Sequence, residues 1–315
     1  EYWVRNASKW EVAGGWRARV INGTLWVRML AIQPHWAERT SVLRLLFSAL
    51  HRPPGAAAIG DVDLVYAHND RDPTPARGYK GRLIPLFTNG HTAFRSSLPI
   101  PEFSWAGWHT HTKPWCHLYD DILGAVKTHP PWRNRTDLAL FSGGLETGSY
   151  RRTLGRLSRT DAGTGVLKVR NVAPRFYTTT RQAQSGRDPP QPMSAMCGYK
   201  YLISIAGYGY SNRLKSLLLC GSVVIHVQQP WNEFFMPLLV DGHNMALARR
   251  VEDVISVVQM LRANTSLAEH IARNGQRLGR TQLAFHRTQA YIRTLLRSYS
   301  SIQRERADEE LSTRG

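Results

Sequence analysis

One stretch in the second half of the chain carries the most regular hydrophobic pattern. Residues 201–206 form a short apolar run that predicts a buried strand, and a small-residue turn follows at 207–211. Residues 213–220 have a helical pattern that ends at Gly221, and glycine commonly stops helices because it adopts a left-handed conformation. A second buried strand is predicted at 222–227. A strand, a helix and a strand in this order are typical of a parallel sheet.

The turn after the first of these strands is a candidate ligand site. Ligands of parallel sheets bind at the carboxyl ends of the strands, where loops meet helix N-termini. That place is the turn with Gly207 and Ser211, and Arg213 stands at the start of the following helix. Because amides of a small-residue turn and a guanidinium both favour anions, the pattern predicts a phosphorylated ligand.

A similar turn occurs earlier in the chain. Residues 137–141 predict a strand that runs into Gly143. Residues 149–158 predict a helix whose first turn carries Arg151, so this turn also offers amides and positive charge to a phosphate. Neither turn matches the GxGxxG dinucleotide fingerprint, and the chain has no GxxxxGK[ST] P-loop.

Strand patterns also occur in the first half. Residues 16–21 and 24–29 flank Asn22-Gly23, the strongest short signal for a β-hairpin. Residues 41–50 predict an amphipathic helix that the following prolines end.

A strand predicted at 61–67 ends in a polar turn that contains Asp70 and Asp72. Carboxylates at the end of a strand are placed for acid–base chemistry. Aspartate favours turns in any protein, so two solvated turn residues are the alternative interpretation.

An aromatic loop at residues 99–108 contains Trp105 and Trp108. Such loops line sugar and peptide clefts, whereas buried tryptophans more often belong to a core. His109 and His111 follow, but without a carboxylate partner their spacing does not predict a metal site.

Composition and charge exclude some classes of protein. The 315 residues are 42% hydrophobic, enough to bury one large core or two modest ones. The formal charge is +18, but the basic residues, mostly arginine, are spread along the chain, so no nucleic-acid partner is predicted. No apolar run approaches the roughly 20 residues of a membrane helix. A membrane anchor, if the protein has one, would lie outside this sequence.

Cysteines and glycosylation sequons bear on the cellular compartment. Three cysteines allow one disulfide and a spare thiol, and their spacing does not decide the pair. Four N-x-S/T sequons mildly favour a secretory lumen; they begin at Asn6, Asn22, Asn134 and Asn264.

Four motifs occur in order after residue 198: YKYLI at 199–203, GYGYSNRLKSLLL at 207–219, GSVV at 221–224 and WNEFF at 231–235. Together they resemble glycosyltransferase family 90, the Rumi-type protein O-glucosyltransferases with their plant and algal relatives and the fungal capsule xylosyltransferases. The match is best to plant and algal members and covers about residues 61–298. It includes the turn around Gly143, the aromatic loop and the strand that ends near Asp70.

The resemblance implies an α/β, GT-B-like architecture in which two Rossmann-like domains face each other across a cleft. With a proline pair at 130–131 as the boundary, the expected parts are an acceptor-side domain at 1–129, a nucleotide-sugar domain at 130–280, a helix at 281–300 that returns to the first domain, and a frayed tail at 301–315. The first 60 residues are not placed by the resemblance.

The implied activity is that of a UDP-sugar-dependent glycosyltransferase. Such an enzyme moves glucose or xylose, with inversion, to an acceptor hydroxyl on protein Ser/Thr or on a glycan. The resemblance further implies no cofactor, no required metal, a monomer, and a location in the endoplasmic reticulum or Golgi lumen.

The resemblance also assigns roles to residues. Asp70 is the expected general base, and Asp72 is its rival because this turn is one residue longer than usual. Trp105 and Trp108 are expected at the acceptor cleft. Glu233 is expected to bind a ribose or sugar hydroxyl, although a helix N-terminal acid is the alternative. The full set expected to bind the UDP-sugar is Gly143, Arg151, Gly207, Ser211, Arg213 and Glu233.

Three positions depart from the family pattern. Ser142 stands where an arginine is common, and Ser204 and Ala206 stand where many relatives have acidic residues. The alternative function is therefore a catalytically degenerate relative that binds a UDP-sugar or glycan without transfer.

Overall fold

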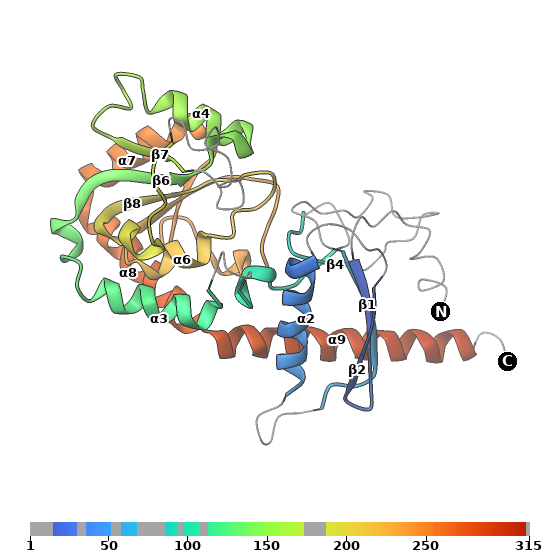
Figure 1. The fold of residues 1–315 in the computed structure, drawn as a ribbon. Coiled ribbons are helices and arrows are strands. Elements are labelled where there is room, and N and C mark those ends of the chain that lie inside the picture. Colours follow the sequence, from blue (N-terminus) through green and yellow to red (C-terminus); the bar gives the residue numbers. More distant parts are fainter. Residues whose placement is uncertain are drawn as a thin grey trace. The chain divides into compact units, whose positions relative to one another are not determined.

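The protein divides into two compact units (Figure 1). Unit 1 consists of Glu1–Pro114, Trp231–Phe234 and Phe285–Gly315, and unit 2 of Trp115–Pro230 and Phe235–Ala284. Both combine a five-stranded sheet with helices, so the fold is α/β, as predicted. The computed structural model describes residues 15–29, 36–51, 58–67, 86–92, 97–107, 113–172 and 187–312.

The sheet of unit 2 is entirely parallel, which is the Rossmann-like arrangement expected of an open α/β sheet. Its strand order is β10-β9-β8-β6-β7. The predicted strand–helix–strand is confirmed, with α6 between two neighbouring parallel strands. The bounds are β6 Thr136–Gly143, β7 Leu167–Asn171, β8 Tyr199–Ser204, α6 Leu214–Leu219, β9 Val223–Val227 and β10 Ala246–Ala248.

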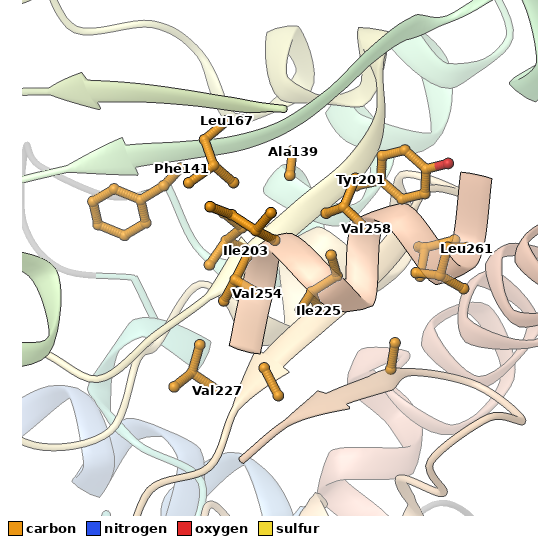
Figure 2. Packing of buried hydrophobic residues seen from close by; sticks show 14 of the residues in the cluster. Ala139, Phe141, Leu167, Tyr201, Ile203, Ile225, Val227, Val254, Val258 and Leu261 are labelled. Carbon is orange, nitrogen blue, oxygen red and sulfur yellow. The ribbon is translucent and has the colours of Figure 1, made fainter. Parts of the chain in front are cut away.

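Helices bury both faces of this sheet. On one face, Phe141, Ile203 and Ile225 pack with Val254 and Val258 of α7 (Figure 2). Leu140 and Leu202 alternate with these residues and are also fully buried, on the opposite face. Burial on both faces explains the nearly continuous apolar runs of the strands. The helices are α3 Trp115–Val126, α4 Ser149–Leu157, α6, α7 Val254–Ala263 and α8 Thr265–Gln282.

The junction between α6 and β9 is stabilised by a glycine conformation, by hydrogen bonds and by a disulfide. Gly221 has a φ of 64°, as expected for the residue that ends the helix. The guanidinium of Arg135 donates to the carbonyls of Cys220 and Gly221 at 2.8 and 2.9 Å, so two terminal carbonyls are satisfied. A disulfide joins Cys197 to Cys220, and Cys116 is the spare thiol.

The first division between the units lies after Pro114, so α3 belongs to unit 2. Two hydrogen bonds explain this membership. Trp115 Nε1 donates to the Leu283 carbonyl at 2.6 Å, and the Tyr119 hydroxyl donates to the Arg280 carbonyl at 2.9 Å. The boundary expected at 129/130 assigns the same helix to the N-terminal part, because a proline pair marks a chain break but not the partners of the helix before it.

The sheet of unit 1 is mixed, with the order β2-β1-β3-β4-β5. The predicted hairpin is confirmed: β1 and β2 pair antiparallel across Asn22 and Gly23, whose φ angles are 49° and 78°. Positive φ at both positions is the type I′ geometry that Asn-Gly favours. The strands are β1 Gly15–Ile21, β2 Thr24–Met29, β3 Val62–Ala67, β4 Leu86–Thr88 and β5 Leu98–Pro99.

The last helix, α9 (Phe285–Ser312), lies against strands of unit 1 together with α2 (Trp36–Leu50). Tyr291 donates its hydroxyl hydrogen to the Pro99 carbonyl at 2.7 Å, and Ser300 donates to the Asp61 carbonyl at 2.7 Å. Helix α9 is continuous to Ser312 and thus includes most of the tail that the sequence predicts to fray. In the part of the chain that the structure describes, no helix has the length and apolar content of a membrane span.

Candidate anion-binding site

Two turns meet at the carboxyl edge of the unit 2 sheet. One links β6 to α4, and the other links β8 to α6. Because β6 and β8 are neighbouring parallel strands, their carboxyl ends emerge side by side. The turns touch directly: a Cβ atom on Gly148 would lie 2.8 Å from the Gly207 carbonyl oxygen. The sequence predicted each turn separately, and the structure brings Gly143, Arg151, Gly207, Ser211 and Arg213 together in unit 2.

Arg151 joins the two turns. Its Nε donates to the Ala206 carbonyl at 3.1 Å and its Nη2 to the Ile205 carbonyl at 3.4 Å, both at the end of β8. Its Nη1 donates to the Thr147 hydroxyl at 2.7 Å in the other turn. Every guanidinium nitrogen therefore has a protein acceptor. These contacts favour a positioning role for Arg151 over direct ligand binding.

Arg213 is differently placed. Its guanidinium lies over the Phe141 ring, 5.0 Å from the centroid, and beside Gly143. Its Nη2 atom is buried and has no hydrogen-bond partner among the described residues. The buried hydroxyl of Ser211 also has none there. Buried polar groups are nearly always paired, so two such groups in one turn indicate a place for a ligand.

Both arginines are partly buried cations close to each other. Burial lowers the pKa of Arg213 to about 9, with a smaller contribution from the positive charge of Arg151. Burial lowers the pKa of Arg151 to about 10, and Glu146 acts in the opposite direction. Neither guanidinium has a carboxylate within ion-pair distance in the described ranges. An anion at Nη2 of Arg213 would offset the repulsion between the two guanidinium groups, so the electrostatics favour a ligand with negative charge.

Glycine at position 143 leaves room for the arginine. A Cβ atom there would lie 2.7 Å from Nη1 of Arg213, too close for the present side-chain position. A Cβ on Gly207 would similarly lie 2.9 Å from Nη2 of Arg151. The glycines are therefore needed for the close approach of the two guanidinium groups to the turns.

For UDP, the ligand that the resemblance implies, we expect Gly143→Ala to weaken binding about tenfold, because the new methyl group displaces the flexible end of Arg213 without disturbing the backbone. Isothermal titration calorimetry measures the change. Gly124→Ala in α3 is the matched control, since a Cβ there meets nothing within 4 Å. Equal affinities of the two variants for UDP would contradict the expected role of Gly143.

The remaining expected site residues lie outside unit 2 or outside the described ranges. Glu233 is 2% exposed and belongs to unit 1, where its neighbour Asn232 exchanges backbone hydrogen bonds with His91. Trp105 is fully buried, and its ring packs edge-to-face against Phe234 at 5.3 Å, in agreement with the core alternative. Asp70, Asp72 and Trp108 lie outside the described residues.

Sequence reasoning missed a third cation at this edge, in addition to Arg151 and Arg213. Arg170 on β7 pairs in register with Ser142 on β6, the position where the family commonly has arginine. Paired residues on neighbouring strands point to the same face, so Arg170 places positive charge beside the serine. Its Nε lies 3.7 Å from an Asp188 carboxylate oxygen. No local pattern relates positions 142 and 170, and only the strand register does so.

Ser204 and His226 form a buried pair on β8 and β9. The Ser204 hydroxyl lies 3.3 Å from Nδ1 of His226. Burial lowers the pKa of His226 to about 4, so this imidazole is neutral at physiological pH. A neutral pair thus occupies a position where many relatives carry an acid. Over the described ranges, no three His, Cys, Asp or Glu side chains are grouped so as to hold a metal ion.

The comparisons with known proteins agree with the resemblance found in the sequence. The model of the family described as "Glycosyl transferase family 90" matches residues 14–313. Protein O-glucosyltransferase 1 of Rattus norvegicus is 28% identical over 256 residues, which cover 76% of this chain and 63% of that protein. O-glucosyltransferase rumi of Drosophila pseudoobscura pseudoobscura is 28% identical over 79% of this chain and 63% of its own length. The chain thus spans less than two thirds of the length of these relatives.

A solved structure is also similar, but more distantly. The crystal structure of Anabaena HepE in complex with UDP-glucose has a TM-score of 0.35 and 16% identity, over 60% of this chain and 47% of that one. A similarity this low carries no weight for the fold or for the ligand of this chain.

Proposed function

The chain belongs to glycosyltransferase family 90, and from this premise we propose that it transfers glucose or xylose from a UDP-sugar to an acceptor hydroxyl, with inversion at the anomeric carbon. The proposal that this chain binds a UDP-sugar donor rests on one observation. The buried Nη2 of Arg213 and the buried hydroxyl of Ser211 lack partners among the described residues, at a sheet edge that suits a nucleotide diphosphate.

The proposed donor site binds the diphosphate of UDP at the two turns of unit 2. Arg213 donates to phosphate oxygens, and the amides near Gly143 and Gly207 approach them from the backbone. Arg151 holds the turns together through the carbonyls of Ile205 and Ala206. As the sugar leaves, negative charge grows on UDP, and a fixed cation lowers the barrier because it requires no reorganisation at that moment. We propose that these arginines supply the charge that a metal ion supplies in other transferases.

The proposed chemical step is a single displacement. The acceptor oxygen forms a bond to the anomeric carbon while the bond from that carbon to the phosphate oxygen breaks. The acceptor loses its proton to a general base, for which Asp70 is the candidate, and UDP departs with the bonding electron pair. Attack from the face opposite to UDP inverts the anomeric centre.

The names of the relatives favour glucose as the sugar and a protein hydroxyl as the acceptor. The disulfide between Cys197 and Cys220 supports an oxidising compartment, because such bonds persist in secretory lumens and are rare in the cytosol. We therefore propose that the protein acts in the endoplasmic reticulum or Golgi lumen.

The test is a donor screen on the purified chain. We expect UDP to bind and UDP-glucose or UDP-xylose to be consumed, with the sugar on water or on an offered protein acceptor. Calorimetry measures binding, and mass spectrometry detects the product. Failure of UDP to bind would contradict the donor-site assignment. UDP binding without release of sugar from either donor would favour the degenerate alternative, consistent with the departures at Ser142 and Ala206.

A further inference from the structure

Helix α4 has two faces with different surroundings. Arg151 and Leu154 face the interior of unit 2, where Arg151 joins the two turns. The outer face lines a separate hollow of about 590 Å³, a size typical of small-molecule sites. Neither Arg213 nor Ser211 lines it. We call this hollow the α4 pocket; its lining residues are Leu145, Ser149, Arg152, Thr153, Gly155, Arg156 and Arg159.

Three exposed arginines of the α4 pocket lack counter-charges. Arg152, Arg156 and Arg159 have no carboxylate within 4.0 Å in the ranges that the structure describes. Nη1 of Arg152 donates to the Glu146 carbonyl at 3.2 Å, and Nη2 of Arg156 donates to the Thr153 hydroxyl at 3.1 Å. Both acceptors are neutral. Each guanidinium has five N–H groups, so most of the donors on this face remain available.

Several other arginines of unit 2 are paired with acids, whereas the α4 pocket gathers three that are not around one hollow. Arg133 bonds Glu269, Arg250 bonds Asp253, and Arg262 bonds Asp137. The pocket concentrates positive charge without such partners, and the positive end of the α4 dipole near Ser149 adds to it.

The spacing of the charges indicates the kind of ligand. Arg152 and Arg156 lie about one helical turn apart on α4, and Arg159 follows just after the helix ends at Leu157, so three separate charges line one hollow. A single carboxylate reaches one such guanidinium, whereas a molecule with several oxyanion groups reaches all three. Arginine is well suited to phosphate and sulfate because its planar fork binds two oxygens at once. We propose that the α4 pocket binds a compact polyanion carrying two or more phosphate or sulfate groups.

The α4 pocket shares the turn between β6 and α4 with the proposed donor site but not Arg213 or Ser211, so its test keeps the donor site filled. Calorimetry at fixed ionic strength with saturating UDP measures binding of inorganic tripolyphosphate and, in a second arm, of a fully sulfated disaccharide. We expect Arg152→Gln/Arg156→Gln to weaken binding of the preferred anion about 100-fold, because two charge-assisted contacts are lost. The two arms distinguish phosphate from sulfate, and binding of either supports the proposal.

The matched control removes the same charge elsewhere on unit 2. Arg249→Gln/Arg277→Gln changes two exposed arginines outside the pocket and is expected to alter the affinity less than twofold. Equal losses in both double variants would assign the binding to overall charge and overturn the proposal. Absence of binding of both anions to the unmodified protein would also overturn it. If UDP itself does not bind, the comparison of the two double variants still decides this proposal.

Discussion

Replacing Arg213 by glutamine is expected to weaken UDP binding about 100-fold, or about 2.8 kcal/mol. Arg213 is the candidate-site arginine whose buried Nη2 has no protein acceptor in the described ranges, so its hydrogen bonds are available to the ligand. Charge-assisted hydrogen bonds contribute about 1.5–3 kcal/mol each, and glutamine keeps much of the length but neither the charge nor the fork. Titration calorimetry with UDP measures the loss.

Uridine provides the control for this prediction, because it has the base and ribose of UDP but no phosphate. We expect Arg213→Gln to leave the affinity for uridine unchanged within twofold. Arg277→Gln, an exposed arginine of the same unit, should leave both affinities unchanged. An equal loss for uridine and UDP would mean that Arg213 maintains the fold of the pocket and does not bind the diphosphate.

The free protein should not lose stability in the same variant. Burial and the neighbouring Arg151 both disfavour the charged form of Arg213, so this cation is retained at a cost in the absence of ligand. We expect the melting temperature of ligand-free Arg213→Gln to equal or exceed that of the unmodified protein. The stabilisation by added UDP should be smaller in the variant, because a weaker ligand shifts the folding equilibrium less.

The local pattern of apolar residues was enough to predict β8, α6 and β9. These elements are buried on both sides, so their apolar runs are strong, and Gly221 marks the helix end through its own conformational preference. The Asn22-Gly23 hairpin was equally accessible because the turn type depends on those two residues alone. Both features are encoded within a few neighbouring positions.

Contacts between residues that lie far apart in the chain could not be predicted from such local patterns. The sequence could not show that Arg151 positions the turns whereas Arg213 is free to bind a ligand, since each is an arginine after a glycine-containing turn. The difference lies in acceptors at Ile205 and Ala206, more than 50 positions from Arg151. Likewise, Arg170 beside Ser142 depends on strand register, and the membership of α3 in unit 2 depends on the Leu283 carbonyl.

Asp70→Asn is expected to reduce the rate of sugar transfer by about 10³-fold, because general-base catalysis contributes about 10²–10⁴-fold and asparagine cannot accept the proton. The assignment rests on the family resemblance and on the position of Asp70 shortly after the end of β3 at Ala67. The affinity for UDP should remain within twofold, since the proposed diphosphate site is formed by the turns of unit 2. Single-turnover kinetics with UDP-glucose, together with calorimetry, separate the two effects.

Asp72→Asn is the matched comparison, because it makes the same chemical change two residues away. If Asp70 is the base, the Asp72 variant should keep its transfer rate within a few-fold. The reverse outcome, with the large loss at Asp72, would show that the longer turn has shifted the catalytic carboxylate along the chain. Full activity in both variants would remove this turn from the mechanism. Another group would then have to take the acceptor proton, because a displacement that inverts the anomeric carbon still needs a base.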